Sequence, residues 1–279
     1  MLCMLMALVA SLLQVFEYEY LDSSSCQLLL SPRYMETVLP PFNCSLCSGS
    51  NAIVDRMSNL TQEEFEQRYA FTGKPVVVTD AQSNWTARTV FDVDYFIRLY
   101  LDENNANEEE TPDEEKTCQF FPYKTNFSNL SEALIYVNKT ITKFKAQDDN
   151  KSEFTRAWYF GWSNCDAGVS QELRKHYRKP YFLPATSYIT RTDWIFMGMP
   201  GYGAHMHIDR VFKPSWQAQI RGTKVWRLQP PAECYHQCPS IIETIVGAGD
   251  TIVLDTNIWY HATEIIGFDI SIVIGSEYD

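Results

Sequence analysis

Short apolar runs separated by turn residues fill the last third of the chain. They are rich in β-branched and aromatic side chains, and glycine, proline or asparagine stands between them. The clearest runs cover residues 216–220, 223–228, 251–254, 257–261 and 269–274. Runs of about four to eight such residues between turn signals are typical of β-strands. The pattern therefore predicts an antiparallel sandwich or barrel over about residues 187–279.

Helical spacing dominates the stretch before these strands. We expect helices near residues 61–69, 90–101, 130–144 and 171–178, and one strand at residues 75–79. In the third helix Leu134, Val137 and Ile141 recur at helical spacing, which favours a face that packs against a core. The chain is therefore expected to be mainly β with flanking helices.

The turn at Arg221-Gly222 joins two of the predicted strands. Gly222 suits a tight hairpin turn that needs a positive φ. Lys224 follows this turn within an otherwise apolar strand. If Lys224 faces a barrel interior, its burial is costly unless an anion such as a dicarboxylate ligand pairs with it. If it faces solvent, it needs no such partner.

His207-Ile-Asp209, together with His261 near the C-terminus, is the strongest candidate for a metal site. Side chains two apart on an extended strand point to the same side, so His207 and Asp209 can hold one ion while His261 comes from a later strand. Two imidazoles and one carboxylate leave part of the coordination sphere open, as in non-haem Fe(II) oxygenases. A centre of three histidines, with His205 in place of Asp209, is an alternative that the spacing leaves open.

Several motifs appear in the order that is typical of one family. They are His207-x-Asp209, Arg221-Gly-x-Lys224 followed by Trp226 and Pro230-Pro231, Gly249-Asp250, and Trp259-Tyr-His261. Weaker matches at residues 60–65, 69–70 and 74–80 precede them. In these motifs the chain resembles the JmjC-type, cupin-like 2-oxoglutarate-dependent oxygenases, from about residue 59 to the end. The resemblance implies a double-stranded β-helix, also called a jelly roll.

The resemblance also implies a function. It assigns His207, Asp209 and His261 to Fe(II). It assigns Lys224 to the distal carboxylate of the co-substrate 2-oxoglutarate. With O₂, members of the family oxidise a substrate, which here is expected to be a protein or peptide side chain that becomes hydroxylated.

Three positions depart from the family pattern. Ala204 stands where many relatives carry a threonine that helps to bind 2-oxoglutarate, and Gly275 stands where an asparagine is common. The usual proline before the Trp-x-His segment is replaced around Asp255-Thr256. Thr186 and Tyr188, or Thr190, are expected to supply the missing hydroxyl. The departures leave open a second interpretation, in which the fold serves as a catalytically inactive binding or scaffold glycoprotein.

The N-terminal residues 1–16 form an apolar run that fits the core of a signal peptide. The run is too short to cross a bilayer, which takes about 20 residues. A buried N-terminal helix is the alternative. Residues 17–58 are a Ser/Cys-rich segment, residues 59–279 are expected to form the cupin-like domain, and no membrane span is expected after removal of the signal.

Seven asparagines stand in Asn-x-Ser/Thr sequons within the first 150 residues. They are Asn43, Asn59, Asn84, Asn126, Asn129, Asn138 and Asn150. Sequons of this kind accept N-glycans in the secretory pathway. We therefore expect a glycoprotein of the endoplasmic reticulum lumen or the cell exterior.

The eight cysteines agree with that location, because disulfides are the rule in an oxidising compartment. Their pairing is not readable from the sequence. Cys44 with Cys47, and Cys234 with Cys238, could each close a short loop or form cross-links to other segments. A zinc site built from these four and His236 is the alternative.

The net charge of −12 excludes one class of partner. Direct binding to nucleic acid needs a basic surface, so no nucleic-acid partner is expected. Residues 102–115 contribute eight acids, which indicate a solvated loop.

Overall fold

The computed structural model describes residues 42–101, 118–145, 157–164, 166–188 and 192–279. Residues 43–279 group into one compact unit, which includes residues 43–58 that the sequence placed before the domain. The predicted signal at 1–16, the sequon at Asn150, Thr190 and the acidic stretch at 102–115 fall outside the described residues.

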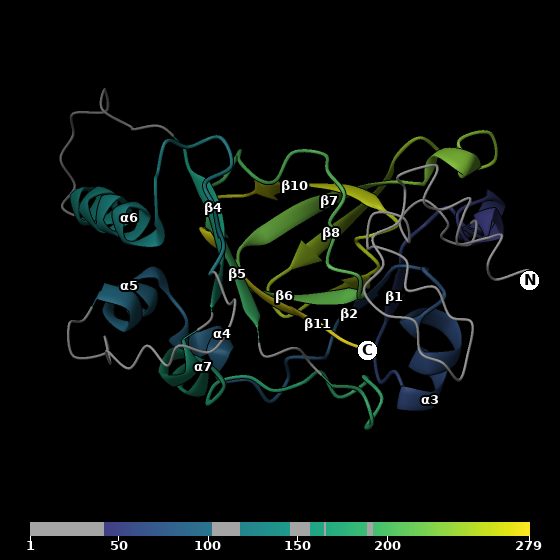
Figure 1. Cartoon of the computed structure of the whole chain (residues 1–279), viewed down its shortest axis with the longest axis horizontal. Helices are drawn as coiled ribbons and strands as arrows, with labels where there is room; N and C mark the ends of the chain where they lie inside the picture. The colour runs from purple at the N-terminus through teal and green to yellow at the C-terminus, as the bar shows by residue number, and fades with distance from the viewer. Residues whose placement is uncertain (1–41, 102–117, 146–156, 165, 189–191) are drawn as a thin grey trace, which may run out of the picture. The chain divides into compact units, whose positions relative to one another are not determined.

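Two sheets form the body of this unit (Figure 1). The larger sheet has eight strands in the order β1-β2-β9-β6-β11-β5-β4-β3, and the smaller has three in the order β10-β7-β8. Neighbouring strands are antiparallel except for β1 and β2. The arrangement confirms the predicted fold, a double-stranded β-helix with flanking helices.

The strands are short, and the predicted strands overlap β2, β6, β7, β9 and β11. The larger sheet holds β1 (Asp55–Met57), β2 (Val76–Val78), β3 (Phe120–Phe121), β4 (Tyr159–Asn164), β5 (Asp193–Gly198), β6 (Ser215–Arg221), β9 (Thr251–Leu254) and β11 (Ser271–Glu277). The smaller sheet holds β7 (Thr223–Gln229), β8 (Ile242–Gly247) and β10 (Tyr260–Ile266). The run predicted at 257–261 is mostly a turn, and its strand begins at Tyr260.

The turn at Gly222 is not a hairpin, so that prediction was wrong. Strand β6 belongs to the larger sheet and β7 to the smaller, so the chain changes sheets at this point. Gly222 does have a positive φ of 71°. A Cβ at this position would lie 2.9 Å from the carbonyl oxygen of Ile270, so glycine is also needed for the close approach of two turns.

Side-chain caps explain where the helices begin. The helices are α3 (Gln62–Phe65), continued by a π-helix (Glu66–Ala70), α4 (Ala87–Val90), α5 (Val93–Leu101), α6 (Leu130–Lys145) and α7 (Ala167–Leu173). The helix predicted at 90–101 is split, because the Asp92 carboxylate accepts from the backbone N–H of Tyr95 and starts a new helix. The Asp166 carboxylate likewise accepts from the N–H of Val169, so α7 begins earlier than predicted.

The side chains of β4 alternate between the two faces of the larger sheet. Trp158, just before the strand, and Phe160 and Trp162 within it belong to the main core. Helices α5 and α6 lie beside this face (Figure 1), where Phe96 of α5 packs edge-on against Trp162 at 5.9 Å between ring centroids. Tyr159 belongs to a separate cluster with Ala204 and Ile265. The strand therefore separates a helix-covered core from the interior of the β-helix.

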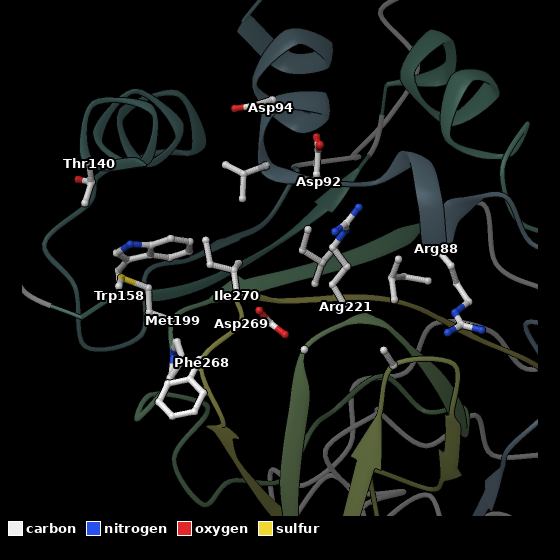
Figure 2. A pocket seen from close by; sticks show the side chains of 16 residues that line it. Arg88, Asp92, Asp94, Thr140, Trp158, Met199, Arg221, Phe268, Asp269 and Ile270 are labelled. Carbon is white, nitrogen blue, oxygen red and sulfur yellow. The ribbon is translucent and has the colours of Figure 1, made fainter. Parts of the chain in front are cut away.

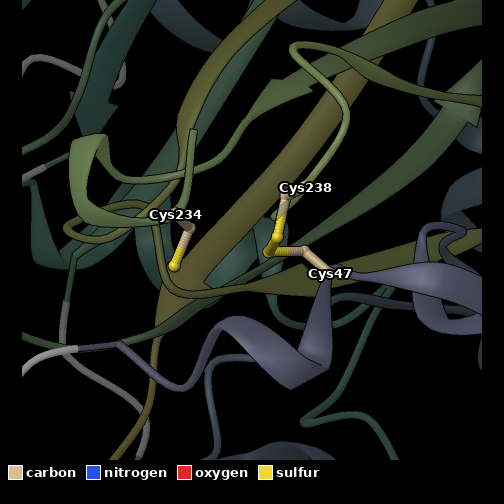
Figure 3. A group of neighbouring side chains, drawn as sticks. All are labelled: Cys47, Cys234 and Cys238. Atoms are coloured by element: carbon tan, nitrogen blue, oxygen red, sulfur yellow. A yellow bond between two sulfur atoms is a disulfide. The ribbon is translucent and has the colours of Figure 1, made fainter. Parts of the chain in front are cut away.

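Two disulfides attach the start of this unit to the connection between β7 and β8. Figure 3 shows one of them, between Cys47 and Cys238, with Cys234 beside it. Cys44, in a 3₁₀ helix (Cys44–Leu46), pairs with Cys234 of a second 3₁₀ helix (Ala232–Cys234), and Cys47 pairs with Cys238. Cys118 is also disulfide-bonded. Bonded sulfurs offer no thiolates, so the four cysteines do not form the alternative zinc site.

Among the described helices, none has the length and apolarity needed to cross a bilayer.

Candidate metal centre

Backbone pairing brings the three predicted ligands together. His207 lies in the extended segment after β5, and its N–H donates to the carbonyl of His261 on β10 at 3.0 Å. The His261 N–H donates back to the His207 carbonyl at 2.8 Å. The Asp209 N–H donates to the carbonyl of Thr256 at 2.9 Å. These bonds hold one end of the smaller sheet against the segment that carries His207 and Asp209.

The three side chains converge as the spacing predicted. Asp209 places one carboxylate oxygen 3.4 Å from Nε2 of His207 and the other 3.7 Å from Nε2 of His261. The two imidazole centroids lie 4.2 Å apart. One ligand atom from each residue lies within 4.8 Å of the other two. This spacing suits three ligands of a single ion.

The outer hydrogen bonds of the two histidines orient them for coordination. Nδ1 of His207 lies 2.7 Å from the carbonyl oxygen of His205, and Nδ1 of His261 lies 3.1 Å from that of Trp259. A carbonyl oxygen can only accept, so each Nδ1 must carry the proton. In the neutral form of each ring, Nε2 is then left with a free lone pair, and both Nε2 atoms face Asp209.

The charge states also suit a cation. Burial would raise the pKa of Asp209, but hydrogen bonding and charge from His207, with charge from His261, hold it below its usual value. Burial, reinforced by the nearby His207, lowers the pKa of His261 to about 4. At neutral pH the site therefore offers a carboxylate and at least one neutral imidazole, which are the forms that bind metals.

His205 is not one of the converging groups. It lines the same cavity, and its ring centroid lies 5.6 Å from that of His207. The group of metal-ligating atoms found together contains Asp209 and not His205. The geometry therefore favours the two-histidine, one-carboxylate centre over the three-histidine alternative.

The three groups open onto a cavity of about 590 Å³ inside the β-helix. A volume of this size holds a small organic ligand. Aromatic side chains form part of its wall, with Tyr123, Tyr159 and Trp194 among the lining residues, and Thr263 and Arg210 add polar groups. The cavity can therefore accept both a small polar ligand near the metal and a further group from outside.

Lys224 is completely buried next to this cavity. Its Nζ donates to the Tyr159 hydroxyl at 2.9 Å and lies 4.8 Å from the centre of the Tyr159 ring. No carboxylate in the described part of the chain lies within ion-pair distance of it. Burial lowers the pKa of Lys224 to about 7. A buried cation without a counter-charge is costly, and an anionic ligand would relieve that cost.

The structure corrects the assignment of Thr186 and Tyr188 to the co-substrate. Both side chains are exposed, Tyr188 at 78%, and neither lines the cavity. The backbone N–H of Tyr188 is held instead by the Asp279 carboxylate. The loop that carries them therefore lies away from the metal centre.

Sequence reasoning missed the hydroxyls that do lie at the site. Tyr159 lines the cavity and its hydroxyl accepts from Lys224, and Thr263 also lines the cavity. Thr263 in turn accepts from the backbone N–H of Ala204, the position that lacks the family threonine. Alternation along the aromatic run 158–162 was the available signal, because it places Tyr159 on the face opposite the two tryptophans.

Comparisons with known proteins give distant relatives. The bifunctional arginine demethylase and lysyl-hydroxylase psr-1 of Caenorhabditis elegans is 23% identical over 201 residues, which are 69% of this chain and 43% of the relative. The arginine-specific demethylase JMJ22 of Arabidopsis thaliana is 26% identical over 178 residues, covering 64% of this chain and 31% of the relative. This chain thus spans less than half the length of either.

The solved structure of E. coli ycfD aligns with a TM-score of 0.46 at 14% identity, over 78% of this chain and 53% of that chain. The profile of the Cupin-like domain family matches residues 62–238, which is more than half of the chain. This stretch contains His207, Asp209 and Lys224, and His261 follows it. As its motifs predicted, the chain belongs to the Cupin-like domain family.

Proposed function

We propose that the protein is an Fe(II)- and 2-oxoglutarate-dependent oxygenase that hydroxylates a protein or peptide side chain. The observation that carries this proposal is the convergence of His207, Asp209 and His261, with the Nε2 atoms of both histidines facing the Asp209 carboxylate. Fe(II) together with 2-oxoglutarate would supply the oxidising power from O₂. The chain would supply the ligands, the charge complementarity and the enclosed cavity.

Lys224 and its neighbours would hold the co-substrate. A buried ammonium pairs well with a carboxylate, and the pairing would raise the lowered pKa of Lys224 because an adjacent anion favours the charged form. Burial raises the pKa of Tyr159, so its hydroxyl stays protonated and can donate a hydrogen bond. Thr263 would take the place of the threonine that is absent at Ala204.

The substrate class rests on the relatives. The names of psr-1 and JMJ22 refer to arginine and lysine side chains, which supports a protein or peptide substrate for this chain. Removal of an N-methyl group begins with hydroxylation of the methyl carbon, so hydroxylation is the step common to both activities. We therefore propose hydroxylation, rather than demethylation, as the reaction.

Turnover of the co-substrate tests the proposal. Protein secreted from a eukaryotic host would be loaded with Fe(II) without oxygen, and succinate formed from 2-oxoglutarate would be measured after air is admitted. We expect His207→Ala and Asp209→Ala to abolish succinate formation and Mn²⁺ binding. The exposed His236 provides the matched control, and His236→Ala should match the wild type. Full turnover by either ligand variant would refute the assignment.

A binding role without catalysis is the second candidate, and Ala204 favours it. This residue lines the cavity with a methyl group where relatives have a hydroxyl. Calorimetry with Mn²⁺ in place of Fe(II) separates the two roles. An oxygenase should release heat on addition of 2-oxoglutarate to the metal-loaded protein, whereas a scaffold should give none.

We also propose that the protein resides in the secretory pathway. All six sequon asparagines in the described segments are exposed, and none lines the metal cavity. The disulfides support an oxidising compartment. Peptide-N-glycosidase treatment in H₂¹⁸O, followed by mass spectrometry, should convert sequon asparagines to labelled aspartate. Asn51 is exposed but outside any sequon, so it should stay unlabelled; an unlabelled protein from a secretory host would count against the location.

A further inference from the structure

A second cavity, of about 640 Å³, lies apart from the metal centre (Figure 2). It is bounded by α4, the start of α5, the end of β6 and the turn between β10 and β11. The linings of the two cavities share no residue. Trp158 lines this cavity and its neighbour Tyr159 lines the other, because they project from opposite faces of the larger sheet.

The floor of this second cavity is apolar. It is formed by side chains of the main core and residues packed against them, among them Val93, Trp158, Met199, Ile220 and Ile270. Trp158 and Met199 lie together at one side, and Arg88 lies at the far side with Arg221 between (Figure 2). The cavity therefore has an apolar end and a cationic end.

The two guanidinium groups have unused hydrogen-bonding capacity. The Nε of Arg221 donates to the carbonyl of Phe91, and neither of its Nη atoms has a hydrogen-bond partner among the described residues. The Arg88 side chain is exposed and makes no hydrogen bond within the same part of the chain, and no carboxylate there lies within ion-pair distance of either arginine. Planar guanidinium groups bind carboxylates through charge-assisted hydrogen bonds that are often bidentate.

Three aspartates also line the cavity, so their environments bear on whether the ligand is an anion or a cation. The Asp92 carboxylate accepts a hydrogen bond from the backbone N–H of Tyr95, and Asp94 already has a partner. Asp269 is exposed on a turn, where water solvates its charge at little cost. Arg221 is half-buried, and its two Nη atoms have no hydrogen-bond partner among the described residues. The cavity therefore favours an anionic ligand over a cationic one.

We propose that this cavity binds a small organic carboxylate with an apolar body. The carboxylate would pair with Arg221 and Arg88, and the body would lie on Met199, Ile270 and the Trp158 indole. The volume matches that of small-molecule sites in proteins, which is about 300–1,000 Å³. The proposal does not rest on the oxygenase function, because it uses none of the residues of the metal cavity.

Isothermal titration of the full-length protein with octanoate tests this site. We expect octanoate to bind, and octylamine, which has the same body and the opposite charge, to bind at least about tenfold more weakly. Arg88→Gln should weaken octanoate binding about tenfold, the loss expected for a charge-assisted hydrogen bond. Arg88 is exposed, and this variant removes no side-chain hydrogen bond or ion pair within the described structure, so it should fold normally. Arg98→Gln is the matched control, because Arg98 is exposed on α5 and does not line the cavity.

Three results would overturn the proposal. The first is no octanoate binding to the wild type. The second is equal affinity for octanoate and octylamine, which would mean that only the apolar floor acts. The third is loss of octanoate binding in Lys224→Met with full binding in Arg88→Gln, which would place the ligand in the metal cavity. A positive result with Arg88 would stand even if the protein failed to turn over 2-oxoglutarate.

Discussion

At the scale of single residues, Lys224 is a buried cation beside the metal cavity. It is fully buried, contacts the Tyr159 hydroxyl and lies 5.8 Å from the centre of the Phe196 ring. Aromatic faces stabilise a cation weakly compared with the hydration that it loses. Without a bound anion, Lys224 therefore destabilises the folded protein.

Replacement of this lysine should change the stability of the folded protein and its binding of 2-oxoglutarate in opposite directions. In Lys224→Met a chain of similar size fills the site without a charge, so we expect the ligand-free protein to gain roughly 1–4 kcal/mol of unfolding free energy. The same variant should lose binding of 2-oxoglutarate. Chemical denaturation and calorimetry measure the two effects. The exposed Lys175 provides the control, and a destabilised Lys224→Met protein would contradict this account.

Titration of Lys224 should make the unfolding free energy of the protein depend on pH. Its pKa is about 7 in the folded chain against an ordinary value of 10.5, so between these values the unfolded chain binds more protons. Stability from this group therefore rises with pH by up to about 1.4 kcal/mol per unit across that window. The advantage of Lys224→Met should shrink as pH rises from 7 to 10. A constant advantage would show that the lysine is not the titrating group.

At the scale of elements, the site depends on the extended segment before His207. This segment lies against β10, and the backbone N–H of Thr263 donates to the Ala204 carbonyl at 2.9 Å. Gly203 permits the approach, because a Cβ there would lie 1.9 Å from the carbonyl oxygen of Thr263. The segment cannot carry a side chain at that position without moving away from the strand that supplies His261.

Gly203→Ala should therefore weaken both the fold and the metal centre. We expect a loss of about 1–3 kcal/mol in unfolding free energy, because backbone must shift to relieve the clash. Mn²⁺ affinity should fall with it, since His207 and His261 would separate. In Gly247→Ala the nearest atom to the new Cβ is 3.8 Å away, so this control should change stability by no more than about 0.5 kcal/mol. Unchanged Mn²⁺ binding by Gly203→Ala would show that the segment does not position the ligands.

At the scale of the whole molecule, two neighbouring disulfides close almost the same large loop. The bonded cysteines are 190 and 191 residues apart in sequence. Closure of a loop of this length removes much of the entropy of the unfolded chain. Once one bond has closed the loop, the second constrains only the few residues between the two bonds.

The contributions of the two disulfides should therefore be strongly non-additive. Removal of both, with alanine at Cys44, Cys47, Cys234 and Cys238, should cost about 4–5 kcal/mol. Removal of either one alone should cost much less than half of that. Denaturant unfolding of the three variants measures the difference. Equal and additive losses would instead indicate that each bond acts through its local contacts.

Local patterns in the sequence were enough for much of the fold. Turn-bounded apolar runs predicted strands at 251–254 and 223–228, and helical spacing predicted the helix near 130–144, because both depend on neighbours in the chain. They could not show that Gly222 moves the chain to another sheet, since that depends on the distant turn at Ile270. They also missed the start of α7, where the single Asp166 cap outweighed the hydrophobic pattern.

The sequence by itself determined which chemistry the chain carries: the spacing of His207 and Asp209, a histidine on a later strand, and a lysine within an apolar run. Only the tertiary structure decided which groups meet. Strand pairing between distant segments aligned His261 with His207, buried Lys224 beside Tyr159, and left Thr186 and Tyr188 outside. Side-chain periodicity reports which way a residue faces, whereas long-range backbone pairing and packing decide what it faces.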